Sequence, residues 1–261
     1  MKILYEDRDI IVCVKEPGVP TQSDKSRDMD MVNMLRNYVN TSGLGGIKVA
    51  GIPYIGLVHR LDRPVGGIMV FAKNAEALKV LNQQLSGKEI CKSYVAIAMI
   101  DDKKKLQDIM NQKPNDIQFD SIYNDKALSP WINVKNNLFK DGKTNLSMIV
   151  DDNNRNGKKA ELYYRIIGVG NREVGSKCID TCMLEVQLLT GRHHQIRVQM
   201  AGEGFPLMGD LKYNKTYAKE FGVATYGKLV ALYSYHLEFL HPRTKKKMEY
   251  VSVPVGGWFV D

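Results

Sequence analysis

The sequence predicts an α+β protein built around a mostly antiparallel sheet. Short runs rich in apolar and β-branched residues predict strands over 10–14, 67–72, 93–100 and 160–169. Polar and apolar residues alternate over 178–189, which is typical of a half-buried strand, and 229–240 with 248–253 should form a closing hairpin. Helices punctuate these strands without a regular βαβ alternation, so we expect a mixed, mostly antiparallel sheet flanked by helices and loops.

Two helices are expected in the first third of the chain. Apolar residues at helical spacing between Met31 and Val39 predict an amphipathic helix over about 29–40. Asn74 stands where an N-cap belongs, and the apolar residues that follow it predict a second helix that ends at Gly87. The stretch 101–145 is polar, contains two prolines and shows little periodicity. We expect an irregular excursion with short strands there.

The composition indicates a globular protein of the reducing cytoplasm. The 261 residues are 44% apolar and 25% charged, which is enough material for a sizeable core. No apolar run approaches the roughly 18 residues of a membrane span, and the N-terminus turns acidic before any apolar run develops. The four cysteines are scattered without zinc-binding spacing, so we expect free thiols, a cytoplasmic location and no metal.

The net charge of +8 favours an anionic partner, and nucleic acid is the commonest one. The two densest basic runs, 103–105 and 245–247, are equally compatible with solvated turns. Charge therefore favours nucleic-acid binding without naming a chemistry.

A polar motif, His59-Arg-Leu-Asp62, follows the apolar start of a strand expected over 57–61. Alternate side chains of a strand share a face, so Arg60 and Asp62 should project together. The turn up to Gly67 would leave Asp62 at the strand tip, where a scaffold commonly presents a reactive group. From spacing alone, an Asp that merely starts a turn beside Arg-Pro is the commoner interpretation.

A second polar cluster is Thr190-Gly-Arg-His-His-Gln-Ile-Arg197. A turn at Gly191 should lead into a short helix over 194–200, whose first N–H groups can hold an anion. His193 and Arg197 are four residues apart and would share a helix face. The alternative is a basic, solvent-facing helix start. Tyr94, in the strand over 93–100, is by itself most simply a core residue with a satisfied hydroxyl.

In order along the chain, these segments resemble the motifs of the RluA-type RNA pseudouridine synthases over about residues 3 to 255. The matching motifs are Tyr5-Glu-Asp-Arg-Asp-Ile-Ile-Val12 with Pro17-Gly18, His59-Arg-Leu-Asp62 with Gly66-Gly67 and Phe71-Ala-Lys73, Tyr94 in its Lys-x-Tyr setting, Gly191-Arg-His-His-Gln-Ile-Arg197, and Leu232 to Pro242.

The resemblance implies a single catalytic domain over 1–261, with a central RNA-binding cleft and without the N-terminal S4-like domain of some relatives. It implies an enzyme, free of cofactor and metal, that isomerises uridine in structured ribosomal or transfer RNA. Nothing in the sequence demands an oligomer, so we expect a monomer. The C1′–N1 bond of the uridine breaks, the base rotates, and it reattaches through C5.

The resemblance also implies a role for each motif residue. Asp62 would be the nucleophile, attacking C1′ of the ribose or C6 of the base, because a carboxylate is already ionised at neutral pH. Arg197 would pair with Asp62 and keep it charged, and Tyr94 would stack on the uracil. Arg60 would enter the space left by the flipped uridine. Substrate and RNA binding would involve further residues of the two polar motifs: His59, Arg192, His193, Gln195 and Ile196, the last as the pocket floor.

The chain departs from the family pattern in three places. Pro64-Val-Gly-Gly67 stands where relatives have Thr-Ser-Gly, Glu16 separates Lys15 from Pro17, and Gln199 takes the place of a His. A catalytically silent RNA-binding protein on the same fold is the alternative function. Asp62, Tyr94 and Arg197 are all present and favour the enzyme. A hydrolase or metal enzyme would need a second acid or ligand cluster, which the motifs do not supply.

Overall fold

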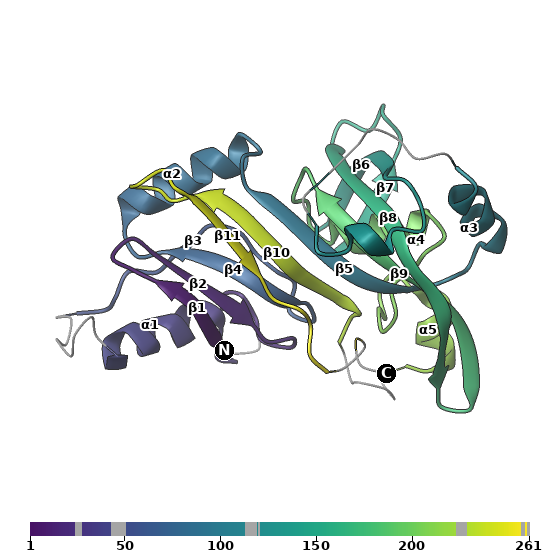
Figure 1. Ribbon diagram of the computed structural model, residues 1–261, viewed down its shortest axis with the longest axis horizontal. Helices are drawn as coiled ribbons and strands as arrows, with labels where there is room; N and C mark the ends of the chain where they lie inside the picture. The colour runs from purple at the N-terminus through teal and green to yellow at the C-terminus, as the bar shows by residue number, and fades with distance from the viewer. Residues whose placement is uncertain are drawn as a thin grey trace. The chain divides into compact units, whose positions relative to one another are not determined.

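The computed structural model describes residues 1–23, 28–42, 51–112, 119, 121–222, 229–256 and 259. The chain packs as two compact units (Figure 1). The first unit is Met1–Cys91 with Ser234–Pro254, and the second is Lys92–Tyr233 with Val255–Asp261. Whether the two act as the single domain expected over 1–261 stays a prediction.

The first unit is built on an antiparallel sheet with two central strands that are buried along their whole length. Strands covered on both faces read as continuous apolar runs, which is why this part of the sequence shows no alternation. The sheet order is β1 (Lys2–Glu6), β2 (Ile10–Lys15), β4 (Gly66–Ala72) and β10 (Leu232–Leu240), with β3 (Gly56–Leu57) beside β4 and β11 (Lys247–Val251) beside β10.

Two helices pack in the first unit, α1 (Met31–Ser42) and α2 (Ala75–Ser86). Both confirm the sequence prediction. The Asn74 side chain accepts the N–H of Ala77 at 2.8 Å and caps α2, which ends at Gly87. Apolar side chains of α2 pack in one core with alternate residues of β2 and β4.

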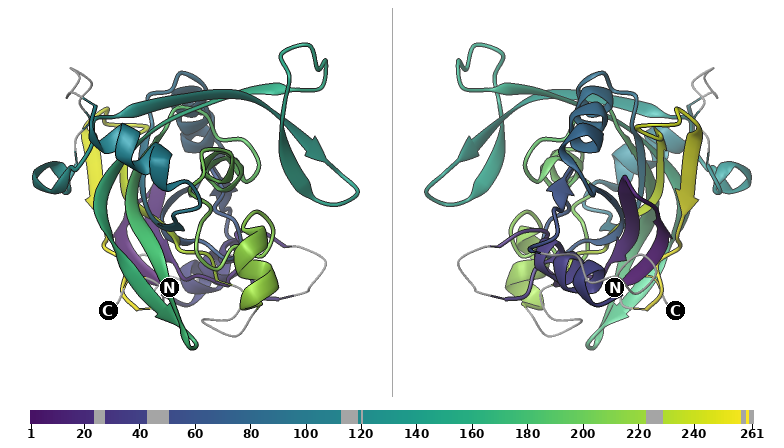
Figure 2. Two further views of the ribbon diagram at one scale, coloured as in Figure 1. Left: turned by 90° about the vertical axis from the view of Figure 1, so that its right-hand side faces the viewer. Right: turned by 90° about the vertical axis from the view of Figure 1, so that its left-hand side faces the viewer.

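The second unit is a five-stranded sheet in the order β5 (Cys91–Met99), β9 (Lys177–Leu188), β8 (Lys158–Val174), β6 (Ile132–Asp141) and β7 (Leu146–Val150). Its pairs are antiparallel. β8 is longer than predicted, because its polar end continues to pair with β9 up to a turn at Gly175, which has φ +61°. β9 lies within one residue of its predicted bounds. Figure 2 shows the β6–β7 hairpin, in teal, projecting from this unit.

The helical elements of the second unit are α3 (Lys103–Met110), the 3₁₀ turn η2 (Asn124–Lys126), α4 (Gln195–Gly202) and α5 (Lys215–Glu220). The irregular segment expected over 101–145 therefore contains a capped helix and a ten-residue strand. Ile109 is the buried residue of α3, whose apolar residues Leu106, Ile109 and Met110 lie at helical spacing in a mostly polar sequence. No helix in the described ranges is long and apolar enough to cross a membrane.

Candidate active site

Asp62 lies in the loop of residues 58–65 that joins β3 to β4, here called the Asp62 loop. The strand expected over 57–61 is wrong, because β3 ends at Leu57 and the following residues pair with no strand. Asp62 instead starts a turn in which the N–H of Val65 donates to the Asp62 carbonyl at 3.0 Å. Both sequence interpretations of Asp62 therefore include the same turn, and its chemistry depends on what holds that turn.

The Asp62 loop is held on both sides of Asp62 by the segment that follows β2. The Thr21 hydroxyl donates to the Leu61 carbonyl at 2.7 Å and accepts the Leu61 N–H at 3.3 Å. On the other side, the Gly18 N–H donates to the Arg63 carbonyl at 2.7 Å, and Arg63 Nε donates back to the Gly18 carbonyl at 3.0 Å. These reciprocal bonds fix the backbone immediately before and after Asp62.

A fully buried lysine lies against this turn. Lys15 has 0% exposure, and its Nζ donates to the carbonyls of Glu16, Val19 and Arg63 at 3.1, 2.7 and 3.2 Å. Burial lowers the pKa of Lys15 to about 7, against the opposing charge of Asp62, which raises it. Three carbonyls match the three donors of an ammonium group, so the segment after β2 and the Asp62 loop together hold the Lys15 ammonium.

The side chains of the motif His59-Arg-Leu-Asp62 differ in exposure. Arg60 is exposed and Asp62 is half-buried, so both can reach a ligand. His59 is buried, and its Nε2 accepts the N–H of Val70 at 3.3 Å. His59 thus supports the loop from inside the first unit, and its contact with RNA stays a prediction.

Gly67 takes the place of the glycine in the family pattern after Asp62, and the structure requires a glycine there. Its φ is +130°, and a Cβ at this position would lie 2.3 Å from the Ser234 carbonyl oxygen. No L side chain fits that approach of β4 to β10. The structure offers no corresponding reason for Val65 and Gly66.

Tyr94 belongs to the second unit, on β5 opposite Val186 of β9, and it is buried. By register it shares a sheet face with Val134 and Asn136 of β6. α4 covers that face, since Gln199 Nε2 donates to Asn136 Oδ1 at 2.7 Å and approaches the Val134 carbonyl at 3.5 Å. The sheet therefore brings Tyr94 to the same face as the second polar cluster.

Gln195 organises the turn before α4. Its Oε1 accepts the Thr190 hydroxyl at 2.8 Å and the Arg192 N–H at 3.0 Å, and its Nε2 donates to the Glu161 carbonyl at 3.1 Å. The Arg192 side chain is exposed, with Nε donating to the Lys159 carbonyl at 2.9 Å. Gln195 and the buried Ile196 thus support the turn and helix, and their contact with substrate stays a prediction.

The expected helix face shared by His193 and Arg197 is wrong, because α4 begins only at Gln195. His194 has φ +54° and ψ +26°, a left-handed conformation that ends the turn. The two histidine rings stack at 3.7 Å between centroids. His193 Nδ1 lies 2.9 Å from the Ser147 hydroxyl, which also donates to the His193 carbonyl at 2.8 Å.

Arg197 forms a buried, two-pronged ion pair with Asp210. Its Nε and Nη2 donate to the two carboxylate oxygens at 2.7 and 2.8 Å, with side chains 5% and 0% exposed. Asp62 belongs to the first unit and Arg197 to the second. The pairing of Arg197 with Asp62 stays a prediction. The motifs did not predict Asp210, the partner of Arg197 in this ion pair.

Residues 9–202 match the RNA pseudouridylate synthase family, and this range includes Asp62, Tyr94 and Arg197. The chain belongs to this family. It is an RNA pseudouridine synthase, an isomerase that modifies RNA, as the order of motifs predicts.

Three relatives show how far the likeness of this synthase extends. It is 29% identical over 252 residues to an uncharacterized RNA pseudouridine synthase of Bacillus subtilis, YlyB, covering 96% of this chain and 68% of the relative. It is 30% identical over 250 residues to ribosomal large subunit pseudouridine synthase D of Xylella fastidiosa, covering 93% and 62%. It is 25% identical over 256 residues to ribosomal large subunit pseudouridine synthase C of Buchnera aphidicola, covering 97% and 67%.

Two human structures share the fold. RNA pseudouridylate synthase domain containing 1 superposes with a TM-score of 0.65 at 17% identity, covering 97% of this chain and 83% of the human one. RNA pseudouridylate synthase domain containing 4 superposes with a TM-score of 0.63 at 20% identity, covering 97% of this chain and 88% of the human one. The predicted α+β pseudouridine synthase fold is therefore confirmed.

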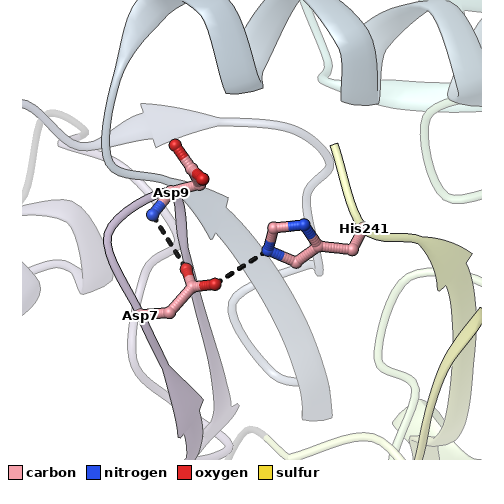
Figure 3. Close-up of side chains that lie close together, drawn as sticks. All are labelled: Asp7, Asp9 and His241. Carbon is pink, nitrogen blue, oxygen red and sulfur yellow. Dashed lines mark hydrogen bonds and ion pairs between the residues drawn. The ribbon is translucent and has the colours of Figure 1, made fainter. Parts of the chain in front are cut away.

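The first and last motifs of the synthase meet in a polar cluster, drawn in Figure 3. His241 Nε2 donates to Asp7 Oδ2 at 2.8 Å, and Asp7 Oδ1 accepts the N–H of Asp9 at 2.8 Å. Arg243 pairs with both oxygens of Asp9 at 2.6 and 2.7 Å. These carboxylates already have protein donors, so we interpret the cluster as a structural link rather than a metal site.

The motifs did not predict three residues that support the site: Lys15 holds the turn at Asp62, and Asp210 and Tyr213 contact Arg197. Lys15 had a visible signal, because a lysine that closes an apolar strand run must reach a partner when it is buried. Asp210 and Tyr213 lie between the recognised motifs, where the sequence pattern alone does not indicate their contacts.

Proposed function

We propose that this RNA pseudouridine synthase isomerises a uridine of ribosomal RNA, with Asp62 as the nucleophile. Ribosomal RNA is supported by the relatives from Xylella and Buchnera, which are named as ribosomal large subunit enzymes and match over 93% and 97% of this chain. The net charge of +8 suits a polyanionic substrate.

The observation that carries the role of Asp62 is its fixed backbone with a half-buried side chain. Hydrogen bonds from Thr21 and Gly18 hold the loop on either side, and the Lys15 ammonium lies against it. A nucleophile acts best when its geometry is set in advance and its carboxylate is reachable. Attack at C1′ or C6 leads to the same balance: the C1′–N1 bond is replaced by C1′–C5, C5 loses its proton, and N1 gains one.

The remaining motif residues divide by exposure. Tyr94 would stack on the uracil, and Arg197 would stabilise the Asp62 carboxylate, as the family resemblance implies. The exposed Arg60 would fill the space of the flipped uridine, and the exposed Arg192 would contact phosphate. Flipping makes the reaction possible on structured RNA, where a paired uridine is out of reach.

The test is genetic and uses one control, which carries the same Asp-to-Asn substitution at a different position. The gene is deleted, pseudouridines are mapped across total RNA, and the strain is complemented with wild type, Asp62→Asn or Asp125→Asn. Asp125 is exposed and lies on η2, away from the motifs. At least one ribosomal site should vanish on deletion and return with wild type and Asp125→Asn only.

Each other outcome removes a different part of the proposal. If Asp62→Asn restores the site, the role of Asp62 is wrong. If the lost site lies in transfer RNA, the substrate is wrong and the role of Asp62 stands. If no site disappears, the synthase modifies no RNA in that cell, and the silent RNA-binding alternative takes its place.

We also propose that the synthase works in the cytoplasm as a monomer. The location is supported by the four cysteines, which are all free thiols, two of them buried. Cell fractionation with an antibody and light scattering of the purified protein test these two points, and recovery in an oxidising compartment or as a dimer would contradict them.

A further inference from the structure

The bidentate ion pair between Arg197 and Asp210 fixes the orientation of the Arg197 guanidinium. We propose that Asp210 is the positioning residue that directs Arg197 in the active site. This inference rests on the proposed function of Arg197. Asp210 is fully buried and binds Arg197 through both oxygens, at 2.7 and 2.8 Å.

Asp210 is itself fixed to the backbone. Its Oδ1 also accepts the N–H groups of Lys212 at 2.9 Å and Tyr213 at 3.2 Å. The residue before it, Gly209, has φ +73°, which starts this tight turn. A carboxylate held by two backbone donors cannot follow a moving arginine, so Arg197 must conform to Asp210.

The pairing sets the direction of the guanidinium group. Arginine has five N–H donors in a rigid planar fork. Asp210 accepts one hydrogen bond from Nε and one from Nη2 of Arg197. These two bonds fix the plane of the guanidinium and its rotation within that plane, and Nη1 lies outside this ion pair. A long side chain with four rotatable bonds thereby presents its terminal nitrogen in one direction.

Tyr213 supports the same guanidinium from its flat side. Its ring centroid lies 5.2 Å from Arg197 Cζ. Its hydroxyl accepts the N–H of Ser147 at 2.7 Å and lies 2.8 Å from His194 Nδ1. Burial lowers the pKa of His194 to about 2, so the ring is neutral and we assign Nδ1 as the acceptor of the hydroxyl proton. The Tyr213 ring is thus anchored to β7 through Ser147 and to the turn before α4 through His194.

The second unit contains a matched pair that tests whether this is positioning or only stability. Arg165 Nη2 and Nε bind Glu185 Oε2 at 2.7 and 2.8 Å, with side chains 7% and 1% exposed. Glu185 lies opposite Val95, and therefore on the other sheet face from Tyr94 and α4. The two pairs share chemistry and burial, and only the Arg197 pair lies on the face of Tyr94.

The experiment compares Asp210→Asn with Glu185→Gln in the full chain. The substrate is a transcript that contains the uridine mapped by the deletion experiment. Single-turnover rates at saturating enzyme, RNA dissociation constants and thermal unfolding are measured together. Both variants should unfold at lower temperature. Asp210→Asn should slow the reaction about 100-fold with the dissociation constant changed less than about threefold. Glu185→Gln should keep its rate within about threefold. Equal rate losses in the two variants would overturn the proposal.

Asp210→Glu covers the case in which Asp210→Asn does not fold. It keeps the buried charge pair but moves the carboxylate by one methylene, so a folded variant should still lose at least about tenfold in rate. In an Arg197→Ala background, Asp210→Asn should slow turnover no further, because there is no guanidinium left to aim. An additional tenfold loss in that background, or a wild-type rate for Asp210→Glu, would contradict positioning.

Two reference variants separate this proposal from the proposed function. If Asp62→Asn and Arg197→Ala are both defective while Asp210→Asn turns over normally, only the positioning role is wrong. If Asp62→Asn turns over normally, the proposed function fails whatever Asp210 does. A wild-type rate for Arg197→Ala overturns the role of Arg197 and the positioning role with it.

Discussion

At the residue scale, the Lys15 ammonium is the group whose protonation the fold controls most directly. Its three carbonyl acceptors use all three of its donors, whereas a neutral amine has only two. Burial brings the pKa of Lys15 to about 7, so its charge titrates within the range in which proteins stay folded.

We predict that replacing Lys15 with Met changes how stability depends on pH. An unfolded lysine keeps its proton up to pH about 10.4, whereas folded Lys15 releases it near 7. Between these values the unfolded state binds more protons, so wild type gains stability over Lys15→Met as pH rises, by at most about 1.4 kcal/mol per unit. Denaturant unfolding from pH 7 to 10 measures this. A difference that stays constant with pH would contradict it.

The exposed Arg60 gives a prediction about base flipping. Removal of a uridine from a stack costs a few kcal/mol, and a side chain that fills the vacated space offsets part of this cost. Arg60→Ala should therefore reduce turnover about tenfold more on a structured RNA than on a short unpaired strand. Arg8→Ala, an exposed change elsewhere in the first unit, should affect both substrates alike. Equal losses for Arg60→Ala would reject the flipping role.

At the scale of elements, the start of β4 determines where the Asp62 loop ends. Gly67 has a φ of +130°, and its backbone approaches Ser234 on β10 too closely for a side chain. Any residue with a Cβ must push the two strands apart or bend the loop.

We predict that Gly67→Ala destabilises the synthase by about 1 to 3 kcal/mol. It should also reduce turnover, because the displacement of the β4 backbone reaches the Asp62 turn. Gly142→Ala is the control, since a Cβ there meets nothing within 4 Å. Denaturant unfolding and single-turnover rates measure both effects. If the two variants are equally stable, the steric argument is wrong.

The sequence predicted elements well where a local signal existed. Asn74 and Gly87 mark the ends of α2, and the apolar run of β4 marks a central strand. It failed at 57–61, where reciprocal bonds from Thr21 replace strand pairing, and no periodicity reports such bonds. Asp210 was missed for the same reason: its meaning depends on Arg197, thirteen residues away, and on the turn that joins them.

At the scale of the whole molecule, the first unit joins the two ends of the family pattern. Asp7 and Asp9 precede β2, and His241 and Arg243 follow β10, yet they form one hydrogen-bonded cluster (Figure 3). The Arg243 guanidinium holds the pKa of Asp9 at about 2, below its usual value. The link is therefore charged at neutral pH.

We predict that Arg243→Ala destabilises the synthase at pH 7, because Asp9 would keep a buried charge without its cation. Asp9 has a lowered folded pKa, so its stabilisation is complete above pH about 4 and disappears as pH falls towards 2. The difference from wild type should shrink over that range in acid unfolding measurements. The exposed Lys246→Ala should show no such difference, and a gap that persists below pH 2 would contradict the account.

The central claim concerns Asp62, and tritium release tests it most directly. Ribosomal RNA from the deletion strain is labelled at C5 of uridine and incubated with purified protein, because reattachment through C5 sends that hydrogen to water. Wild type and Asp125→Asn should release about one equivalent per modified site, and Asp62→Asn should release none. Release by Asp62→Asn at the wild-type rate would contradict Asp62 as the nucleophile.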